Sequence, residues 1–337
     1  MPLTQDEALA RYEAGGHAIE ARLCAEDPGD GYLPQSGRIV RWSAPPLVRC
    51  DHALAAGAEV SPFYDSMLGK VIAQATSRAA AVEQLAEALD RTVCLGVATN
   101  RAFLAKVLRH PGFAAGGATT DFLATQFADD AARRTAAPSA LEALAAAAAA
   151  LLPREHLAPP WRGWSSSPAV ACSVPLIVGG QARAWLLTGT RADLVARCGE
   201  AQHRIVGLAE RRGNDAGGEV EAEIDGHQVR ASFGRDGDAS WWLAAGAEIA
   251  VVDARLQGRA ATSARAAGAL LAPMHGRVTQ VLVAPGHAVD AGALLVVIEA
   301  MKMEHQLRAP RAGTVGALHA RPGDQVAARQ CLVELQP

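Results

Sequence analysis

Residues Glu299-Ala300-Met301-Lys302-Met303-Glu304 lie between the two halves of an internal repeat near the end of this 337-residue chain. A shift of 37 positions places Ala272-Pro273 on Ala309-Pro310, Gly276 on Gly313, Pro285-Gly286 on Pro322-Gly323 and Leu295-Val296 on Leu332-Val333. Two similar β-rich halves joined by a short link would present Lys302, one of only three lysines in the chain, on a rigid scaffold. A carrier domain that is loaded covalently on a lysine amine needs this arrangement.

The segment Ala300-Met301-Lys302-Met303 resembles the biotinylation motif of the biotinyl domains of biotin-dependent carboxylases. The resemblance implies a flattened β-barrel or sandwich with a pseudo-twofold repeat, and covalent attachment of biotin to Lys302. It also implies that Met301, Met303 and the acidic Glu299 belong to the surface that a biotin protein ligase recognises. Two alternatives stay open: an ordinary solvated lysine, and a lipoyl-type acyl carrier, although lipoyl domains usually have Asp-Lys-Ala at this turn.

The composition narrows the class of protein. A length of 337 residues predicts two or three domains, and a hydrophobic content of 50% is ample for their cores. The net charge of −3 comes without a basic stripe, so a nucleic-acid partner is not expected. The six cysteines form no Cys-x-x-Cys pair, so we expect neither a zinc site nor a disulfide framework. No apolar run suits a membrane span and no secretory signal opens the chain, so a cytoplasmic location is expected.

Pattern changes along the chain predict its organisation. We expect a mixed α+β domain over residues 1–128, a helical linker over 129–160, a β-rich interaction domain over 161–258, a linker over 259–268 and the repeat domain over 269–337. In the first domain, alternation predicts a strand at His17–Leu23, and helical spacing predicts helices at Ala79–Leu89 and Asn100–Leu108. Ser139, followed three residues later by Glu142, is typical of a capping box that starts an alanine-rich helix.

Strand patterns dominate the middle of the chain and predict a small antiparallel barrel. The expected strands are Val170–Pro175, Ala182–Thr188, His203–Ala209, Glu219–Ile224, His227–Phe233, Ala239–Ala244 and Glu248–Asp253. Asp225-Gly226 between two alternating runs is a strong hairpin signal.

The front of the chain resembles the C-terminal region of the biotin carboxylase family. The matching stretches, in order, are Gly16–Arg22 with Ala25–Pro28 after it, Leu33–Gly37, Val48-Arg49, Ser61–Lys70 and Gly96–Asn100. The resemblance implies that Arg22 is the catalytic arginine that faces the biotin ureido group, with Glu20 as its ion-pair neighbour. We expect Asp65 and Lys70 to be structural polar residues on a helix near an interface.

The order of these parts resembles the biotin-containing α-subunit of an acyl-CoA carboxylase of the methylcrotonyl-, geranyl- or propionyl-CoA type. The resemblance implies that biotin on Lys302 is carboxylated with ATP and bicarbonate and delivers CO₂ to an acyl-CoA such as 3-methylcrotonyl-CoA. That transfer would occur on a partner carboxyltransferase β-subunit that contacts the middle domain, in a hetero-oligomer.

The chain departs from this family pattern at its beginning. The family's ATP-grasp module, which holds ATP and Mg²⁺ in a full-length member, would precede Gly16, and this chain starts at Met1. We therefore expect an N-terminally truncated subunit that is inactive alone. The alternative function is a non-catalytic biotin carrier and assembly module.

Overall fold

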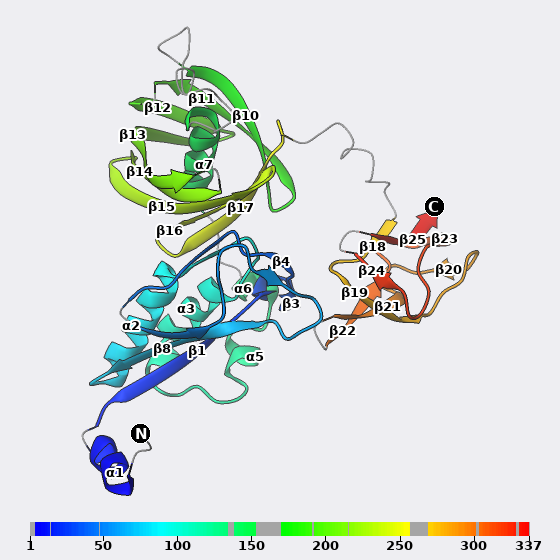
Figure 1. Ribbon diagram of the computed structural model, residues 1–337. Helices are drawn as coiled ribbons and strands as arrows, with labels where there is room; N and C mark the ends of the chain where they lie inside the picture. Colours follow the sequence, from blue (N-terminus) through cyan, green and yellow to red (C-terminus); the bar gives the residue numbers. More distant parts are fainter. Residues whose placement is uncertain are drawn as a thin grey trace.

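The computed structural model describes residues 4–13, 15–46, 48–133, 138–152, 170–190, 192–214, 216–256, 269–300, 303–327 and 330–336. We refer to the described residues of 4–133 as the front unit, those of 138–256 as the barrel and those of 269–336 as the C-terminal unit. Figure 1 shows these parts in blue to cyan, green to yellow and orange to red. No helix in the described ranges is long and apolar enough to cross a membrane.

The front unit is built on a three-stranded antiparallel sheet. Its strand order is β1 (His17–Cys24), β8 (Met67–Ala75) and β6 (Arg49–His52). Helices α2 (Arg78–Arg91) and α3 (Arg101–Arg109) pack against it, so that Leu85 and Leu89 meet Val71 in one core. The remaining elements are α1 (Gln5–Glu13), β2 (Glu26–Asp27), a 3-10 turn (Pro28–Asp30), β3 (Leu33–Pro34), β4 (Gly37–Arg38), β5 (Arg41–Ser43), β7 (Glu59–Val60), β9 (Val93–Leu95), α4 (Pro111–Ala114), α5 (Phe122–Gln126) and α6 (Asp130–Arg133).

The structure confirms the first strand and both helices, but the expected helix around Lys70 is wrong. Lys70 lies on strand β8, whose residues alternate between more and less buried positions. The largely apolar run Met67–Ala75 does not separate helix from strand by periodicity, and β-branched Val71 and Ile72 favour the strand. Asp65 precedes β8 and accepts a hydrogen bond from the backbone N–H of Met67 at 2.9 Å.

The middle of the chain forms a closed antiparallel barrel in which each strand pairs with its sequence neighbour. The strands are β10 (Val170–Val178), β11 (Gln181–Gly189), β12 (Asp193–Cys198), β13 (Ala201–Asn214), β14 (Gly217–Ile224), β15 (His227–Asp236), β16 (Ala239–Ala244) and β17 (Ala247–Asp253). Pairing of β10 with β17, where Ile177 lies opposite Val252, closes the barrel. The predicted barrel is confirmed, and β12 is a strand that the sequence patterns missed.

Helix α7 (Ser139–Leu151) lies inside this barrel, as Figure 1 shows. Alanines 143 and 146–148 are completely buried, and they share one core with Trp185, Phe233 and Trp242 of the strands. The helix that we expected in a linker is therefore the filling of the barrel. The expected capping box is also wrong: Pro138 holds the cap position, and Ser139 Oγ lies 2.8 Å from His203 Nε2 on β13.

The C-terminal unit confirms the predicted two-sheet repeat. One sheet has the order β18 (Ala269–Leu271), β25 (Cys331–Gln336), β23 (Gly313–Leu318), β20 (Ala288–Val289), and the other β22 (Met303–Arg308), β21 (Leu294–Ala300), β19 (Gly276–Val281), β24 (Gln325–Val326). Residues matched by the repeat occupy equivalent core positions: Val278 and Val315 are both buried, as are the pairs Leu295–Leu332 and Val296–Val333. The sequence repeat is thus a repeat of core positions.

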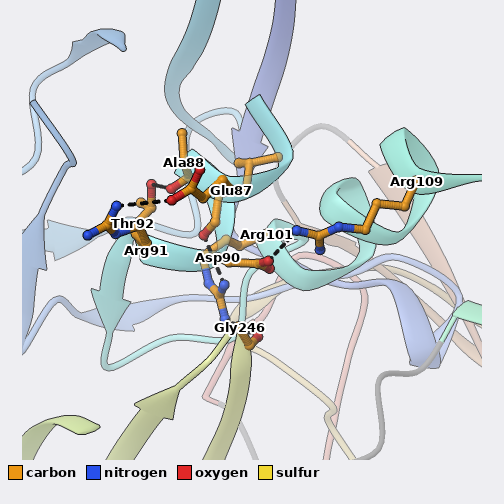
Figure 2. A network of polar contacts seen from close by, with 9 residues as sticks. Glu87, Ala88, Asp90, Arg91, Thr92, Arg101, Arg109 and Gly246 are labelled. Carbon is orange, nitrogen blue, oxygen red and sulfur yellow. Dashed lines mark hydrogen bonds and ion pairs between the residues drawn. The ribbon is translucent and has the colours of Figure 1, made fainter. Parts of the chain in front are cut away.

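A buried arginine connects the front unit to the barrel. Arg101 donates hydrogen bonds to the carbonyl oxygens of Leu89 and Gly246, each at 3.0 Å, and its Nη2 lies 3.3 Å from Glu248 Oε2. Figure 2 shows Arg101 reaching from α3 past the end of α2 to the turn at Gly246. Leu243 of the barrel shares an apolar cluster with Val93 and Leu95, so the two units share both polar and apolar contacts.

Candidate functional site

The predicted attachment site lies at the end of a tight β-hairpin. Strands β21 and β22 pair antiparallel, with Glu299 opposite Glu304 and Ala300 opposite Met303 as the last pair. Met301 and Lys302, the central residues of the predicted motif, lie outside the described residues. Because Ala300 pairs with Met303, these two residues make the whole connection between the strands. Ala300 is buried in the core of the C-terminal unit, which fixes the last strand pair before the turn.

The end of the hairpin carries two acidic residues. Glu299 and Glu304 are both exposed and lie directly opposite each other. Like charges in such a pair destabilise a sheet. His305, the residue after Glu304, does not offset this charge, because burial lowers its pKa and leaves the ring neutral at neutral pH. Arg277 of β19 lies opposite Glu299 on the other side, so one basic residue flanks the acidic pair within the sheet.

The same end of the hairpin lies beside a loop of the front unit. Pro62 and Phe63 line a cavity of about 180 Å³ together with Gly276, Arg277, Glu299, Ala300 and Gln325. Gly276 is required there, because a Cβ atom at this position would lie 2.7 Å from the carbonyl oxygen of Glu299. Phe63 and Tyr64 of the loop remain 69% and 73% exposed. Figure 1 shows the β22 end of the C-terminal unit turned toward the front unit.

Arg22 lies in a charged row on the sheet of the front unit. Its Nε is 3.6 Å from Glu20 Oε1, and Lys70 Nζ is 3.6 Å from Glu20 Oε2. The predicted Arg22–Glu20 ion pair is therefore present. The Arg22 side chain is 70% exposed, so its guanidinium retains donors for an anionic or polar ligand. Among the described residues, no hydrogen bond or ion pair joins Arg22 to the hairpin.

The sequence analysis missed Asn100 as a residue that positions Arg22. The buried Asn100 amide donates to the Arg22 carbonyl oxygen and to Glu26 Oε1, each at 3.1 Å, and its Oδ1 accepts from the N–H of Cys24 at 2.9 Å. These bonds fix the backbone of β1 at the arginine. The signal was available, since Asn100 closes one of the stretches that carried the family resemblance.

Comparisons with known proteins assign both ends of the chain. Residues 20–125 match the family described as biotin carboxylase C-terminal domain, and residues 268–335 match the family described as biotin-requiring enzyme. The human mitochondrial propionyl-CoA carboxylase alpha chain is 28% identical over 99% of this chain and 48% of its own length. The rat mitochondrial methylcrotonoyl-CoA carboxylase subunit alpha is 28% identical over 100% of this chain and 49% of its own length.

A bacterial relative extends this similarity. The propionyl-CoA carboxylase alpha chain of Ruegeria pomeroyi is 30% identical over 95% of this chain and 51% of its own length. The chain thus spans about half the length of the curated relatives that it matches. It is a homologue of the α-chains of acyl-CoA carboxylases, combining a biotin carboxylase C-terminal domain with a biotinyl domain, and its cofactor is covalently bound biotin.

Proposed function

We propose that this chain acts as the biotin-carrying part of an acyl-CoA carboxylase α-subunit and that Lys302 is the residue that carries biotin. The observation that supports the proposal is the register of the β21–β22 hairpin, which leaves only Met301 and Lys302 between the paired Ala300 and Met303. A carrier lysine must be reached by a ligase and by two active sites, and a short connection between two strands suits that requirement. The neighbouring Glu299 would contribute to ligase recognition.

The residues of the hairpin fit this cofactor. The ε-amine of Lys302 would form an amide with the biotin carboxyl group, and biotin then supplies a ureido nitrogen that accepts and releases a carboxyl group. The chain itself supplies the rigid hairpin and the exposed guanidinium of Arg22. A guanidinium is suited to stabilise negative charge on the ureido oxygen. Asn100 would keep Arg22 in place through the backbone of β1.

We further propose that the barrel binds a carboxyltransferase β-subunit. Its lumen is filled by α7, so a partner would use the outer surface. Leu186 on β11 is 47% exposed there, and an exposed large apolar side chain is a candidate interface anchor. The acyl-CoA would be 3-methylcrotonyl-CoA or propionyl-CoA, because relatives named for both substrates match at 28–30% identity.

Biotin attachment is tested in the full chain, coexpressed with a biotin protein ligase and analysed by streptavidin blotting and intact mass. We expect one biotin mass on the wild type and none on Lys302→Ala. Lys106→Ala and Lys70→Ala are matched controls, since they remove the other two lysines of the chain and should leave the signal unchanged. A streptavidin signal that survives Lys302→Ala would disprove the assignment, and a lipoyl mass would favour the lipoyl-carrier alternative.

The partner site is tested by binding of the full chain to purified β-subunits of the propionyl- and methylcrotonyl-CoA types. Leu186→Asp should weaken binding by about 2 kcal/mol if Leu186 is an interface hot spot. Leu282→Asp is the matched control, because Leu282 is 50% exposed but lies just after β19 of the C-terminal unit. If Leu186→Asp binds the β-subunit as tightly as the wild type and Leu282→Asp binds it more weakly, the interface lies on the C-terminal unit and not on the barrel.

A further inference from the structure

We propose that His319, Cys331 and Glu334 of the C-terminal unit form a zinc-binding site. One ligand atom from each residue lies within 4.8 Å of the other two. His319 Nε2 and Glu334 Oε1 are already 3.1 Å apart. The site does not depend on biotin attachment, because none of its residues belongs to the β21–β22 hairpin.

The fold of the C-terminal unit brings these residues together. His319 follows the last residue of β23, and its backbone N–H donates to the Leu332 carbonyl oxygen at 2.8 Å. Cys331 and Glu334 lie on β25, which pairs with β23 so that Glu334 is opposite Ala317. Since β25 also pairs with β18, it lies inside its sheet, and its backbone is held on both sides. The three side chains thus project from a rigid base.

From the sequence we expected no zinc site. That expectation rested on the absence of closely spaced cysteine and histidine residues in the sequence. The ligands here are assembled by antiparallel pairing of two strands, which joins residues well apart along the chain. Spacing rules for zinc fingers do not detect a site of this kind.

The chemistry of the ligands selects the metal. An imidazole nitrogen, a thiolate and a carboxylate oxygen are all ligands of zinc, whereas Mg²⁺ and Ca²⁺ prefer oxygen ligands alone. Tetrahedral zinc with bonds of roughly 2.0–2.3 Å requires ligand atoms roughly 3.3–3.6 Å apart. The His319–Glu334 distance of 3.1 Å is slightly shorter than this spacing, and the Cys331 sulfur lies within 4.8 Å of both ligand atoms, so small side-chain shifts would bring the three atoms to it. In the part of the chain that the structure describes, the Cys331 thiol donates a long hydrogen bond of 3.8 Å to the Val333 carbonyl oxygen.

The exposure of the ligands leaves room for a fourth one. His319 and Glu334 are exposed and Cys331 is half-buried, so a water molecule would complete the coordination. Bound zinc would tie the end of β23 to the start of β25. Because the metal would bind the folded state and not the unfolded chain, it would raise the unfolding midpoint of the C-terminal unit.

The test uses the full chain after treatment with a chelator and dialysis. Titration with Co²⁺ should give the absorption of a tetrahedral site with a sulfur-to-cobalt charge-transfer band, and Zn²⁺ should displace it. Cys331→Ser should abolish the charge-transfer band. Glu334→Gln should keep the band but lower the zinc affinity by about tenfold or more. Even residues that only hydrogen-bond to a metal ligand change metal affinity by about 10–100-fold in other sites. Cys198→Ser is the matched control, because Cys198 is a half-buried cysteine of the barrel.

Three results would overturn the proposal. The first is the absence of a charge-transfer band in the wild type. The second is a band that persists in Cys331→Ser or disappears in Cys198→Ser. The third is an unchanged zinc affinity of Glu334→Gln, a variant that tests the site even if Cys331→Ser does not fold.

Discussion

The junction between the front unit and the barrel allows a quantitative prediction for Arg101→Met. The Arg101 side chain has no exposed surface, and that of its partner Glu248 is 18% exposed. Methionine keeps most of the length of the side chain but removes its charge and its bonds to the Leu89 and Gly246 carbonyl oxygens. Removing one partner of a buried ion pair costs about 3–5 kcal/mol, because the other charge remains buried without compensation. We expect a loss of that size in the free energy of unfolding.

Arg109→Met is the matched control from the same helix. Arg109 Nη2 lies 2.6 Å from Asp90 Oδ2, but the Arg109 side chain is 44% exposed. Exposed pairs contribute about 0–1 kcal/mol, so this variant should lose much less stability. Figure 2 shows both arginines approaching the end of α2 from α3. The difference between the two variants in the free energy of unfolding therefore measures the effect of burying an ion pair, apart from the presence of the pair itself.

Urea unfolding followed by tryptophan fluorescence measures both variants, since Trp241 and Trp242 lie on β16 next to the junction. Burial raises the pKa of Glu248, and Arg101 opposes that effect. A carboxyl group with a raised folded pKa stabilises the protein at low pH, and that stabilisation is lost as the pH rises through the folded pKa. The loss of unfolding free energy in Arg101→Met should thus be smaller at acidic pH than at neutral pH. Equal losses below ~1 kcal/mol in both variants would refute the reasoning.

Two further predictions concern the barrel turns. Gly246 has a φ of +81°, and a Cβ atom there would collide with the Asp90 carboxylate. Gly246→Ala should therefore lower the free energy of unfolding by about 1–3 kcal/mol in the same urea assay. Gly226 has a φ of +85° but open space around it, so Gly226→Ala should show only the cost of the strained backbone. His203 donates a hydrogen bond to the Asp225 carboxylate and thereby lowers the pKa of Asp225. A carboxyl group with a lowered folded pKa stabilises the fold at pH values above its usual pKa, and this stabilisation is lost as the pH falls through the folded pKa. Thermal unfolding across acidic pH should show this loss, of about 0.5–1 kcal/mol, in the wild type and not in Asp225→Asn; parallel pH profiles would contradict it.

The parts of the fold that the sequence predicts well are those with a periodic or repeated signal. The 37-residue repeat predicts the two sheets of the C-terminal unit and the hairpin between its two halves, because the repeated residues are the core residues. Helix α2 follows from apolar residues at helical spacing after the Ser77 cap, whose side chain accepts from the Ala80 N–H. In each of these cases the local pattern and the tertiary packing agree.

The parts that the sequence does not predict depend on long-range packing. The alanine run of α7 presents no distinct apolar face, so its pattern does not tell a linker from a helix inside a barrel. Arg101 resembles any surface arginine until Gly246 and Glu248 are placed beside it by the barrel. Strand β12 is short and mixes Asp193 and Arg197 with its apolar residues, so only its pairing with β11 and β13 defines it.

The position of α7 has a consequence for the order in which the barrel assembles. The helix precedes every barrel strand in the sequence, so it leaves the ribosome first. Closure of the barrel waits for the pairing of β10 with β17, the first and last strands, and contacts so distant in sequence form slowly. A helix already present can act as a template around which successive hairpins wrap. The alanine run can therefore be present before the barrel closes, and its small side chains fit the space inside the closed barrel.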